Sequence, residues 1–335
     1  MKRLAVITAS VAAWFFSSTQ MVFAEADKVN FLLDWVVYGR ATPYFVAFEK
    51  GFFSARNIEP KIERGYGSAA GLKRIAAGQA DFLFADFGGL VLARANEGLK
   101  AKMIAVVYSK NGHAVHYLEG SGINKPADFA GKRVAGAAGA TVTLMFPGFL
   151  RANGVDPATV RIVSVDAQAL NPVLLAKQFD GMLEYNFNNA LLVKEGAKTG
   201  LKPTLMLYGD HNFRFYANGI ITTDEIIAKK PDLAKRFAAA IVEGVTYSFA
   251  HPEESCTLLR KHAPSVDQDV CLTELGLVKT LALTDETNAN GIGYMSKAGV
   301  QGTIDVMKDY MGLKAAITPE ETFDMSFLPK AGAPR

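Results

Sequence analysis

This chain has few cysteines and few histidines, and its basic and acidic residues nearly balance. Its 335 residues include two cysteines, five histidines, and 36 basic against 33 acidic residues. Nucleic-acid binding normally needs a concentrated basic face, so this balance gives that function no support. The sequence also holds no nucleophile-elbow G-x-S-x-G, Walker loop or HExxH motif, which removes the commonest signatures of hydrolases, nucleotide-binding enzymes and zinc proteases.

Long hydrophobic runs are missing after the first residues. In the segment 1–24, Lys2 and Arg3 precede an apolar run from Leu4 to Phe16, and Val22-Phe23-Ala24 supplies a small-residue cleavage site. That run is shorter than the roughly 20 apolar residues that span a bilayer core. We therefore expect 1–24 to be a signal peptide. Because no cysteine stands at the cleavage point to carry a lipid, we expect a free periplasmic protein.

From residue 28 onward, short β-rich runs alternate with helical patterns, which is typical of a mostly parallel sheet with crossover helices. The first half predicts strands at 28–33, 59–63, 81–85 and 102–108, and helices at 43–50, 68–78 and 89–97. A second unit follows with strands at 133–135, 161–165, 181–185 and 204–208, and helices at 141–152 and from residue 171. The pattern predicts an α/β architecture with two lobes.

The last third of the chain is chiefly helical. After a strand-like run at 219–222, the residues from Asp224 on offer too few strands for their own sheet, so they most simply pack back on the first lobe. The chain then crosses between the lobes twice, near 109–120 and 209–219, which predicts a two-stranded hinge. We predict that lobe 1 is discontinuous and that lobe 2 is inserted into it, with bounds at 25–115 and 216–335 for lobe 1 and 116–215 for lobe 2.

Several short sequence motifs resemble those of a known protein family. In order along the chain they are Leu32-Leu33-Asp34-Trp35, FVAFEKGFF at 45–53, Gly65-Tyr66-Gly67-Ser68, AAGQADF at 76–82, LEGSG at 118–122 and DFAGKRV at 128–134. Over residues 28–250 the chain resembles the NMT1/THI5-like family, whose members include solute-binding proteins for nitrate, sulfonates, taurine and pyrimidine precursors. The resemblance implies a type II periplasmic-binding-protein fold, a small-molecule ligand, and delivery to the permease and ATPase of an ABC importer in the inner membrane. We expect a monomer without a cofactor.

In open α/β sheets, ligands lodge beyond the carboxyl ends of the strands, where loops and helix N-termini converge. The first such segment runs from Asp34 to Arg40. Trp35 and Tyr38 are candidates to sandwich a flat ligand, although Trp35 at a strand end also fits a core position. Arg40 fits either a bidentate grip on a carboxylate, sulfonate or phosphate, or a solvated loop charge.

Two further loops of the first lobe lead into helices. Beside Tyr66, the backbone N–H groups around Gly67 are free to approach a ligand, and Ser68 either contacts the ligand or caps the helix. In the next loop, Asp86 precedes Phe87 and is either an N-cap or an acceptor for a ligand N–H. Both loops are predicted to line the site.

The second lobe supplies the opposite jaw, through Gly139 and Thr141 at a helix start and Glu184-Tyr185-Asn186 after a strand. A carboxylate such as Glu184 is unfavourable in an anion pocket, because like charges repel in a closed cleft of low dielectric constant. With Asp86 it favours a small, planar ligand that carries N–H donors, such as a pyrimidine precursor of thiamine. This jaw lacks a second tryptophan, so a sulfonate, nitrate or aromatic carboxylate stays an alternative.

The histidines give a metal site little support. His113 and His116 flank an extended-looking Ala114-Val115, so they do not share a helix face, and no further ligands accompany them. We therefore expect no metal site. His211 lies at the second crossing and faces either the cleft or solvent.

The two cysteines are predicted on consecutive helices. Pro252 opens the helix that carries Cys256, and Ser265 with Gln268 indicates a capping box for the helix that carries Cys271. A disulfide and two free buried thiols both fit this pattern. A bridge closing a loop of this size would stabilise the fold by about 3 kcal/mol and would have no catalytic role.

Catalysis is the main competing function. The resemblance includes fungal proteins that make a pyrimidine with a cysteine-rich motif and a pyridoxal cofactor. In this chain both cysteines lie in the helical tail, and the leader directs export. We expect a non-enzymatic binding protein; a periplasmic sensor adaptor would use the same two-lobed clamp.

Overall fold

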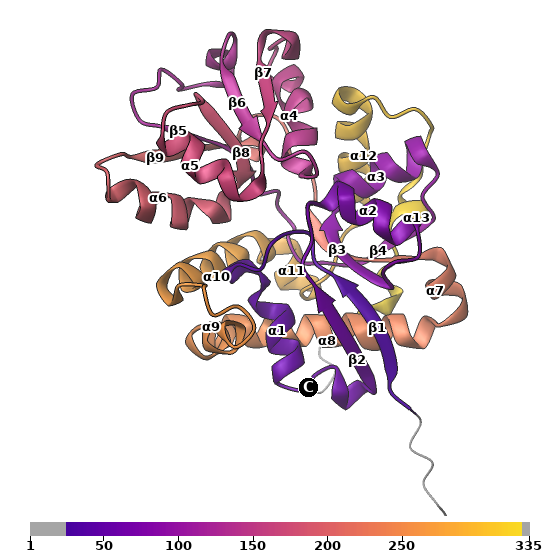
Figure 1. The fold of residues 1–335 in the computed structure, drawn as a ribbon. Helices are drawn as coiled ribbons and strands as arrows, with labels where there is room; N and C mark the ends of the chain where they lie inside the picture. Colours follow the sequence, from indigo (N-terminus) through magenta and orange to yellow (C-terminus); the bar gives the residue numbers. More distant parts are fainter. Residues whose placement is uncertain (1–24, 330–335) are drawn as a thin grey trace, which may run out of the picture.

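The computed structural model describes residues 25–329, which form two α/β lobes, each built on a five-stranded sheet (Figure 1). The predicted signal peptide lies outside the described residues. Within them, no helix is both long enough and apolar enough to cross a membrane. The predicted α/β class with two lobes is confirmed.

The first sheet has the strand order β2-β1-β3-β10-β4. Its strands are β1 (Asp27–Leu32), β2 (Ile58–Glu63), β3 (Phe82–Asp86), β4 (Ala101–Val106) and β10 (Asn218–Thr223). β1 runs parallel to β2 and β3, whereas β10 is antiparallel to both its neighbours. Every residue of β3 is buried, as expected for a central strand covered on both faces. The helices between these strands are α1 (Thr42–Glu49), α2 (Ser68–Ala76) and α3 (Phe87–Glu97).

The second sheet repeats this plan with the order β7-β6-β8-β5-β9. Its strands are β5 (His113–Leu118), β6 (Arg133–Gly136), β7 (Arg161–Ser164), β8 (Gly181–Tyr185) and β9 (Pro203–Leu207), with helices α4 (Thr141–Ala152), α5 (Leu170–Leu175) and α6 (Asn189–Ala197). β5 is antiparallel to β8 and β9, as β10 is to its neighbours. In each sheet, the strand that directly follows a crossing between the lobes therefore runs antiparallel to both its neighbours.

The two crossing segments are residues 107–112 and 208–217, between β4 and β5 and between β9 and β10. They lie side by side, because Val107 and Tyr108 both donate backbone N–H groups to the Asn218 carbonyl at 2.8 Å, and Ala217 donates to Tyr108 at 3.0 Å. The first crossing is shorter than expected, since the predicted segment 109–120 contains β5. The predicted change of lobe at residue 116 falls inside this strand. Two buried histidines, His113 and His116, hid its strand character.

The C-terminal third is helical, as predicted. It comprises α7 (Asp224–Lys229), α8 (Pro231–Ala250), α9 (Pro252–Arg260), α10 (Gln268–Ala282), α11 (Asp285–Asn290), α12 (Lys297–Met311) and α13 (Pro319–Thr322). α8 packs along α1, where Gly244 permits close approach to Pro43, and Phe237 stacks on Phe82 of the sheet at 3.8 Å between ring centres. α12 packs against both α3 and α4, so this tail touches both lobes.

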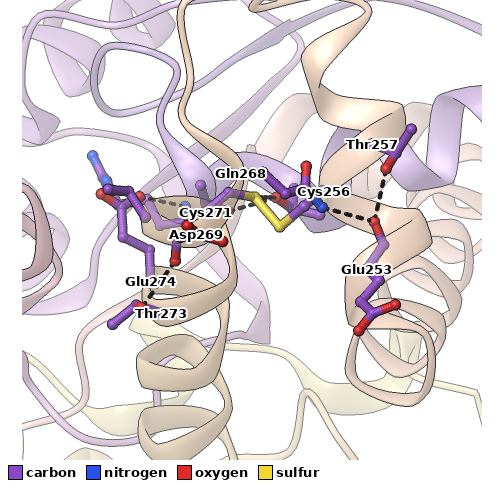
Figure 2. The surroundings of a disulfide bond; sticks show 12 residues. Glu253, Cys256, Thr257, Gln268, Asp269, Cys271, Thr273 and Glu274 are labelled. Carbon is purple, nitrogen blue, oxygen red and sulfur yellow. Dashed lines mark hydrogen bonds between the residues drawn. A yellow bond between two sulfur atoms is a disulfide. The ribbon is translucent and has the colours of Figure 1, made fainter.

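Cys256 and Cys271 form a disulfide that joins α9 to α10 (Figure 2). The predicted capping box of Ser265 with Gln268 is wrong: Asp267 is the N-cap of α10, and its carboxylate accepts the N–H groups of residues 269 and 270. The side chain of Gln268 instead donates to the carbonyl of Glu253 on α9 at 3.2 Å. The disulfide and this bond hold the two helices together.

Candidate functional site

The loops at the carboxyl ends of β1 and β8 meet the N-termini of α2 and α4 between the lobes. They enclose a cavity of about 10 Å³, lined by Asp34, Trp35, Arg40, Gly67, Ser68, Ala140, Thr141, Glu184 and Tyr185. Seven of these nine residues were candidates from the sequence alone. The volume suits about one water molecule, so the lobes are closed in this conformation. A small-molecule ligand enters only when they separate.

Two glycines set how closely the lobes approach. Gly67, the N-cap of α2, has φ +111°, and a Cβ atom built there would lie 1.8 Å from the carbonyl oxygen of Gly139 in the other lobe. A Cβ on Gly139 would lie 2.3 Å from the carbonyl oxygen of Tyr66. Backbone therefore meets backbone across the interlobe boundary, and only glycine permits both the conformation and the contact at position 67.

Arg40 is buried and paired within its own loop. Its Nη1 atom donates to Asp34 at 3.0 Å, and its side chain is 6% exposed. Burial alone would lower the pKa of Arg40, but the Asp34 carboxylate outweighs it and holds that pKa above its ordinary value. The guanidinium also lies 5.7 Å from the ring centre of Tyr185 and 5.9 Å from that of Phe187, across the interlobe boundary. The alternative of a solvated loop charge is wrong.

Asp86 has two partners. Oδ1 caps α3 by accepting the Gly89 N–H at 2.8 Å, whereas Oδ2 lies 3.5 Å from Nε2 of His113 and accepts no hydrogen bond from a described residue. Burial raises the pKa of Asp86 to about 7 and lowers that of His113 to about 3, which favours the neutral imidazole. Ser68 does not cap its helix; its hydroxyl accepts the Asp86 N–H at 3.2 Å.

Two glutamates complete the acidic surroundings of Arg40. Glu184, at the end of β8, accepts the N–H of Tyr185 at 3.0 Å, and Glu274 of α10 accepts the backbone N–H of Arg40 at 3.1 Å. Burial raises the pKa of each glutamate to about 7, against the lowering effect of these hydrogen bonds. Tyr38 is half-buried, and burial raises its pKa, which the charges of Glu184 and Glu274 raise further.

Sequence reasoning missed Glu274 and Asn218. Glu274 lies among the buried residues Val270, Cys271, Leu275 and Val278 of α10. A carboxylate on the apolar face of a predicted helix, at i, i+3, i+4 spacing, was the sequence signal that could have identified it. Asn218 links the lobes: its amide donates to Asp34 at 2.8 Å and its carbonyl oxygen accepts the Tyr185 hydroxyl at 2.8 Å. No local pattern marks Asn218, because both its partners are remote in sequence.

Thr141 and Trp35 form the remaining walls of the cavity. Thr141 begins α4, and its hydroxyl is buried without a hydrogen-bond partner among the described residues. Trp35 is 6% exposed, so it is a core residue in this closed conformation as well as a lining residue. It also lines an outer groove of about 410 Å³ that runs between Tyr66 of one lobe and residues 164–167 of the other. Tyr66 is 65% exposed there and carries the Arg64 guanidinium 4.4 Å above its ring.

The seven predicted site residues that do not line the cavity are Tyr38, Tyr66, Asp86, Phe87, Gly139, Asn186 and His211. Phe87 is fully buried as the first residue of α3, and Asn186 packs against Gly112 of the first crossing. His211 lies near the C-terminal end of α4, where its carbonyl accepts the Asn153 side-chain amide at 2.8 Å. In residues 25–329, no group of three or more His, Cys, Asp or Glu side chains is placed to hold a metal ion.

This arrangement can recognise a small molecule by acceptors and aromatic faces. Glu184 offers carboxyl oxygens, Thr141 offers a hydroxyl, and Trp35 and Tyr185 offer rings. The two lobes, each built on a five-stranded sheet, have the fold of periplasmic binding proteins. The likeness to solved structures agrees: the alkanesulfonate-binding protein SsuA from Xanthomonas axonopodis, bound to MOPS, superposes with a TM-score of 0.70 at 12% identity, covering 90% of this chain and 99% of that one.

The chain belongs to the NMT1/THI5 like family, whose model matches residues 39–255. Among its relatives, the riboflavin-binding protein RibY of Chloroflexus aurantiacus is 22% identical over 309 residues, which cover 90% of this chain and 86% of RibY. The 4-amino-5-hydroxymethyl-2-methylpyrimidine phosphate synthase of Legionella pneumophila is 26% identical over 240 residues, covering 72% of this chain and 75% of the synthase.

Proposed function

We propose that this protein is the periplasmic solute-binding component of an ABC importer and captures a small, planar, nitrogen-containing molecule between its lobes. The observation that carries the proposal is the balance of charge in the closed site. Three buried carboxyl groups, those of Asp34, Glu184 and Glu274, lie around one arginine that is already paired. A fourth, that of Asp86, is buried beside His113. A ligand that donates N–H groups or carries positive charge satisfies them.

An anionic ligand would meet an unfavourable site. Arg40 would have to leave Asp34, and the ligand charge would approach Glu184 and Glu274 in a medium of low dielectric constant. A nitrogen heterocycle gains instead from stacking on Trp35 or Tyr38 and from the carboxyl acceptors. The names of two relatives, one for riboflavin and one for an aminopyrimidine, support this ligand class, whereas the name of SsuA supports an alkanesulfonate as the alternative.

We infer binding without catalysis, although one relative is named as a synthase. The cysteines of this chain are joined to each other between α9 and α10, which removes them as nucleophiles. The interlobe cavity closes by contact between two glycine loops, as a clamp requires. In the proposed cycle the ligand stabilises the closed state by the contacts that only closure makes, and the closed protein docks on the permease.

Calorimetric titration tests the ligand class directly. The panel is 4-amino-5-hydroxymethyl-2-methylpyrimidine, riboflavin, butanesulfonate and nitrate, measured with the wild type, Glu184→Gln and the exposed control Glu119→Gln in the same lobe. We expect a nitrogen heterocycle to bind. We expect Glu184→Gln to weaken the binding of this heterocycle at least tenfold, or about 1.4 kcal/mol, because an amide NH2 group replaces one carboxyl oxygen that would accept a hydrogen bond.

The Glu119→Gln control should match the wild type. Tight binding of butanesulfonate or nitrate that is unchanged or strengthened in Glu184→Gln would contradict the proposed ligand class and favour the anion alternative. Binding of every compound with equal affinity in all three proteins would contradict the interlobe site itself.

A further inference from the structure

A second hollow lies on the hinge side of the molecule, and we name it the hinge cleft. It encloses about 570 Å³ and is lined by both crossing segments, the end of α10 and one face of α12. A volume of this size is typical of small-molecule pockets. The cleft is therefore far larger than the interlobe cavity of about 10 Å³.

The inner surface of the hinge cleft is mainly apolar with a few polar groups. Leu207, Phe215 and Leu281 contribute apolar side chains. Ser109, from the first crossing, contributes a buried hydroxyl that has no hydrogen-bond partner among the described residues. Buried polar atoms are nearly always paired, so an unpaired hydroxyl at the wall of the cleft is unusual.

The charged residues that line the hinge cleft are Lys110, Arg214 and Asp210. Two of the three are cationic, and neither cation forms an ion pair with any residue in 25–329. Arg214 is fixed at Nε, which donates to the Gly209 carbonyl at 2.6 Å. Its terminal nitrogens and the Lys110 ammonium therefore favour a ligand with an anionic group.

The hinge cleft and the interlobe cavity are separate sites that share a wall. Phe215 lines the cleft, and its ring centre lies 5.1 Å from that of His113. His113 in turn lies 4.5 Å from Tyr185, which lines the interlobe cavity. The two sites also have opposite charge preferences, because carboxyl groups surround the interlobe cavity and unpaired cations line the cleft.

We propose that the hinge cleft is a second small-molecule site, which binds an organic anion with an apolar or aromatic body. The ligand places its anionic group near Lys110 and Arg214 and its apolar body against Phe215 and Leu281. A ligand there contacts both crossing segments at once. The inference does not depend on which solute binds between the lobes.

Fluorescence titration with 8-anilinonaphthalene-1-sulfonate, an aromatic sulfonate, tests this site. Gly302 of α12 lines the cleft, and an added Cβ atom there meets no other atom within 4 Å, so Gly302→Leu adds an apolar side chain at the cleft from an open position. Gly276→Leu is the matched control: Gly276 is also helical, is equally open, and lies outside the cleft. Gly299 is unsuitable, because a Cβ atom there would lie 2.4 Å from the Tyr216 hydroxyl.

We expect saturable binding of one probe per protein in the wild type and in Gly276→Leu. The affinity should fall at least tenfold in Gly302→Leu, and at least tenfold in the double variant Lys110→Glu/Arg214→Glu, with an unchanged melting temperature in Gly302→Leu. Equal affinity in Gly302→Leu and the wild type would overturn the proposal, as would the absence of saturable binding in the wild type. A loss of affinity in Glu184→Gln alone would place the probe between the lobes and would also overturn it.

Discussion

Burial governs how the side chains between the lobes behave. Asp86, Glu184 and Glu274 each keep a hydrogen bond from a backbone N–H, yet the loss of water raises their pKa values to about 7. Asp34 is different because Arg40 and Asn218 both donate to it. The closed site therefore holds one satisfied ion pair, and Glu184 is the further carboxyl group that lines the cavity. In the proposed function this group gains from a donor-rich ligand.

The raised pKa of Glu184 predicts a specific pH dependence of stability. Its pKa is about 7 in the folded protein against an ordinary 4.5, so the folded state binds more protons between these values. The stability that Glu184 contributes is therefore fully present below about pH 4.5 and is lost as the pH rises through 7. Glu184→Gln removes this contribution, so its free energy of unfolding should fall less than that of the wild type between pH 5 and pH 8, as measured by urea unfolding.

The comparison with the wild type is needed because the shifted pKa values of other groups change the stability with pH in the opposite direction. Burial lowers the pKa of His113 to about 3 and that of His116 to about 4, so they add stability above pH 6.5 that is lost as the pH falls. These terms are common to both proteins and cancel in the difference. If Glu184→Gln and the wild type show the same change between pH 5 and pH 8, the pKa of Glu184 is not raised.

Among the elements, α10 connects the disulfide to the binding loop. Cys271 and Glu274 lie three residues apart on this helix (Figure 2), and Glu274 accepts the backbone N–H of Arg40. Cys271 also contacts the hydroxyl of Thr42 at the start of α1. A helix from the C-terminal tail thus fixes a loop near the N-terminus of the first lobe.

Loss of the disulfide should destabilise the fold. Cys256 and Cys271 are separated by 15 residues, and opening a loop of that length costs about 3 kcal/mol in the free energy of unfolding. Cys256→Ser/Cys271→Ser should therefore unfold at a clearly lower urea concentration than the wild type. A reducing agent should shift the wild type and leave the double variant unchanged. Equal midpoints for the wild type with and without reductant would contradict this contribution.

Elements with local signals could be predicted, and long-range partners could not. The bounds 141–152 and 181–185 agree with α4 and β8, because apolar periodicity and turn residues lie within each segment. Gly67 and Ser68 were placed at a ligand loop by the same kind of signal. Glu274 was missed because it meets Arg40 across 234 positions of sequence. β5 was missed because its histidines interrupt the apolar strand pattern.

For the molecule as a whole, the proposed function depends on two lobes that meet at glycine loops and would turn on the paired crossing segments. The crossings hydrogen-bond to each other near Tyr108 and Asn218, next to the side chains that link the lobes. Opening must break the contact of Gly67 with Gly139 and the bond from Tyr185 to Asn218. In the proposed cycle, a ligand that reaches both lobes adds contacts that exist only in the closed state, and this would couple closure to binding.

Mass spectrometry of the solute released from protein purified from its native cells tests this account most directly. Gly67→Ala should prevent closure, since its Cβ would lie 1.8 Å from the carbonyl oxygen of Gly139, whereas Gly78→Ala also adds a side chain at positive φ, +69°, with nothing within 4 Å. We predict one nitrogen-containing solute, near one per protein, in the wild type and Gly78→Ala, and at least tenfold less in Gly67→Ala. A sulfonate or nitrate in the wild type, or equal solute in Gly67→Ala and Gly78→Ala, would contradict capture by closure around an acidic site.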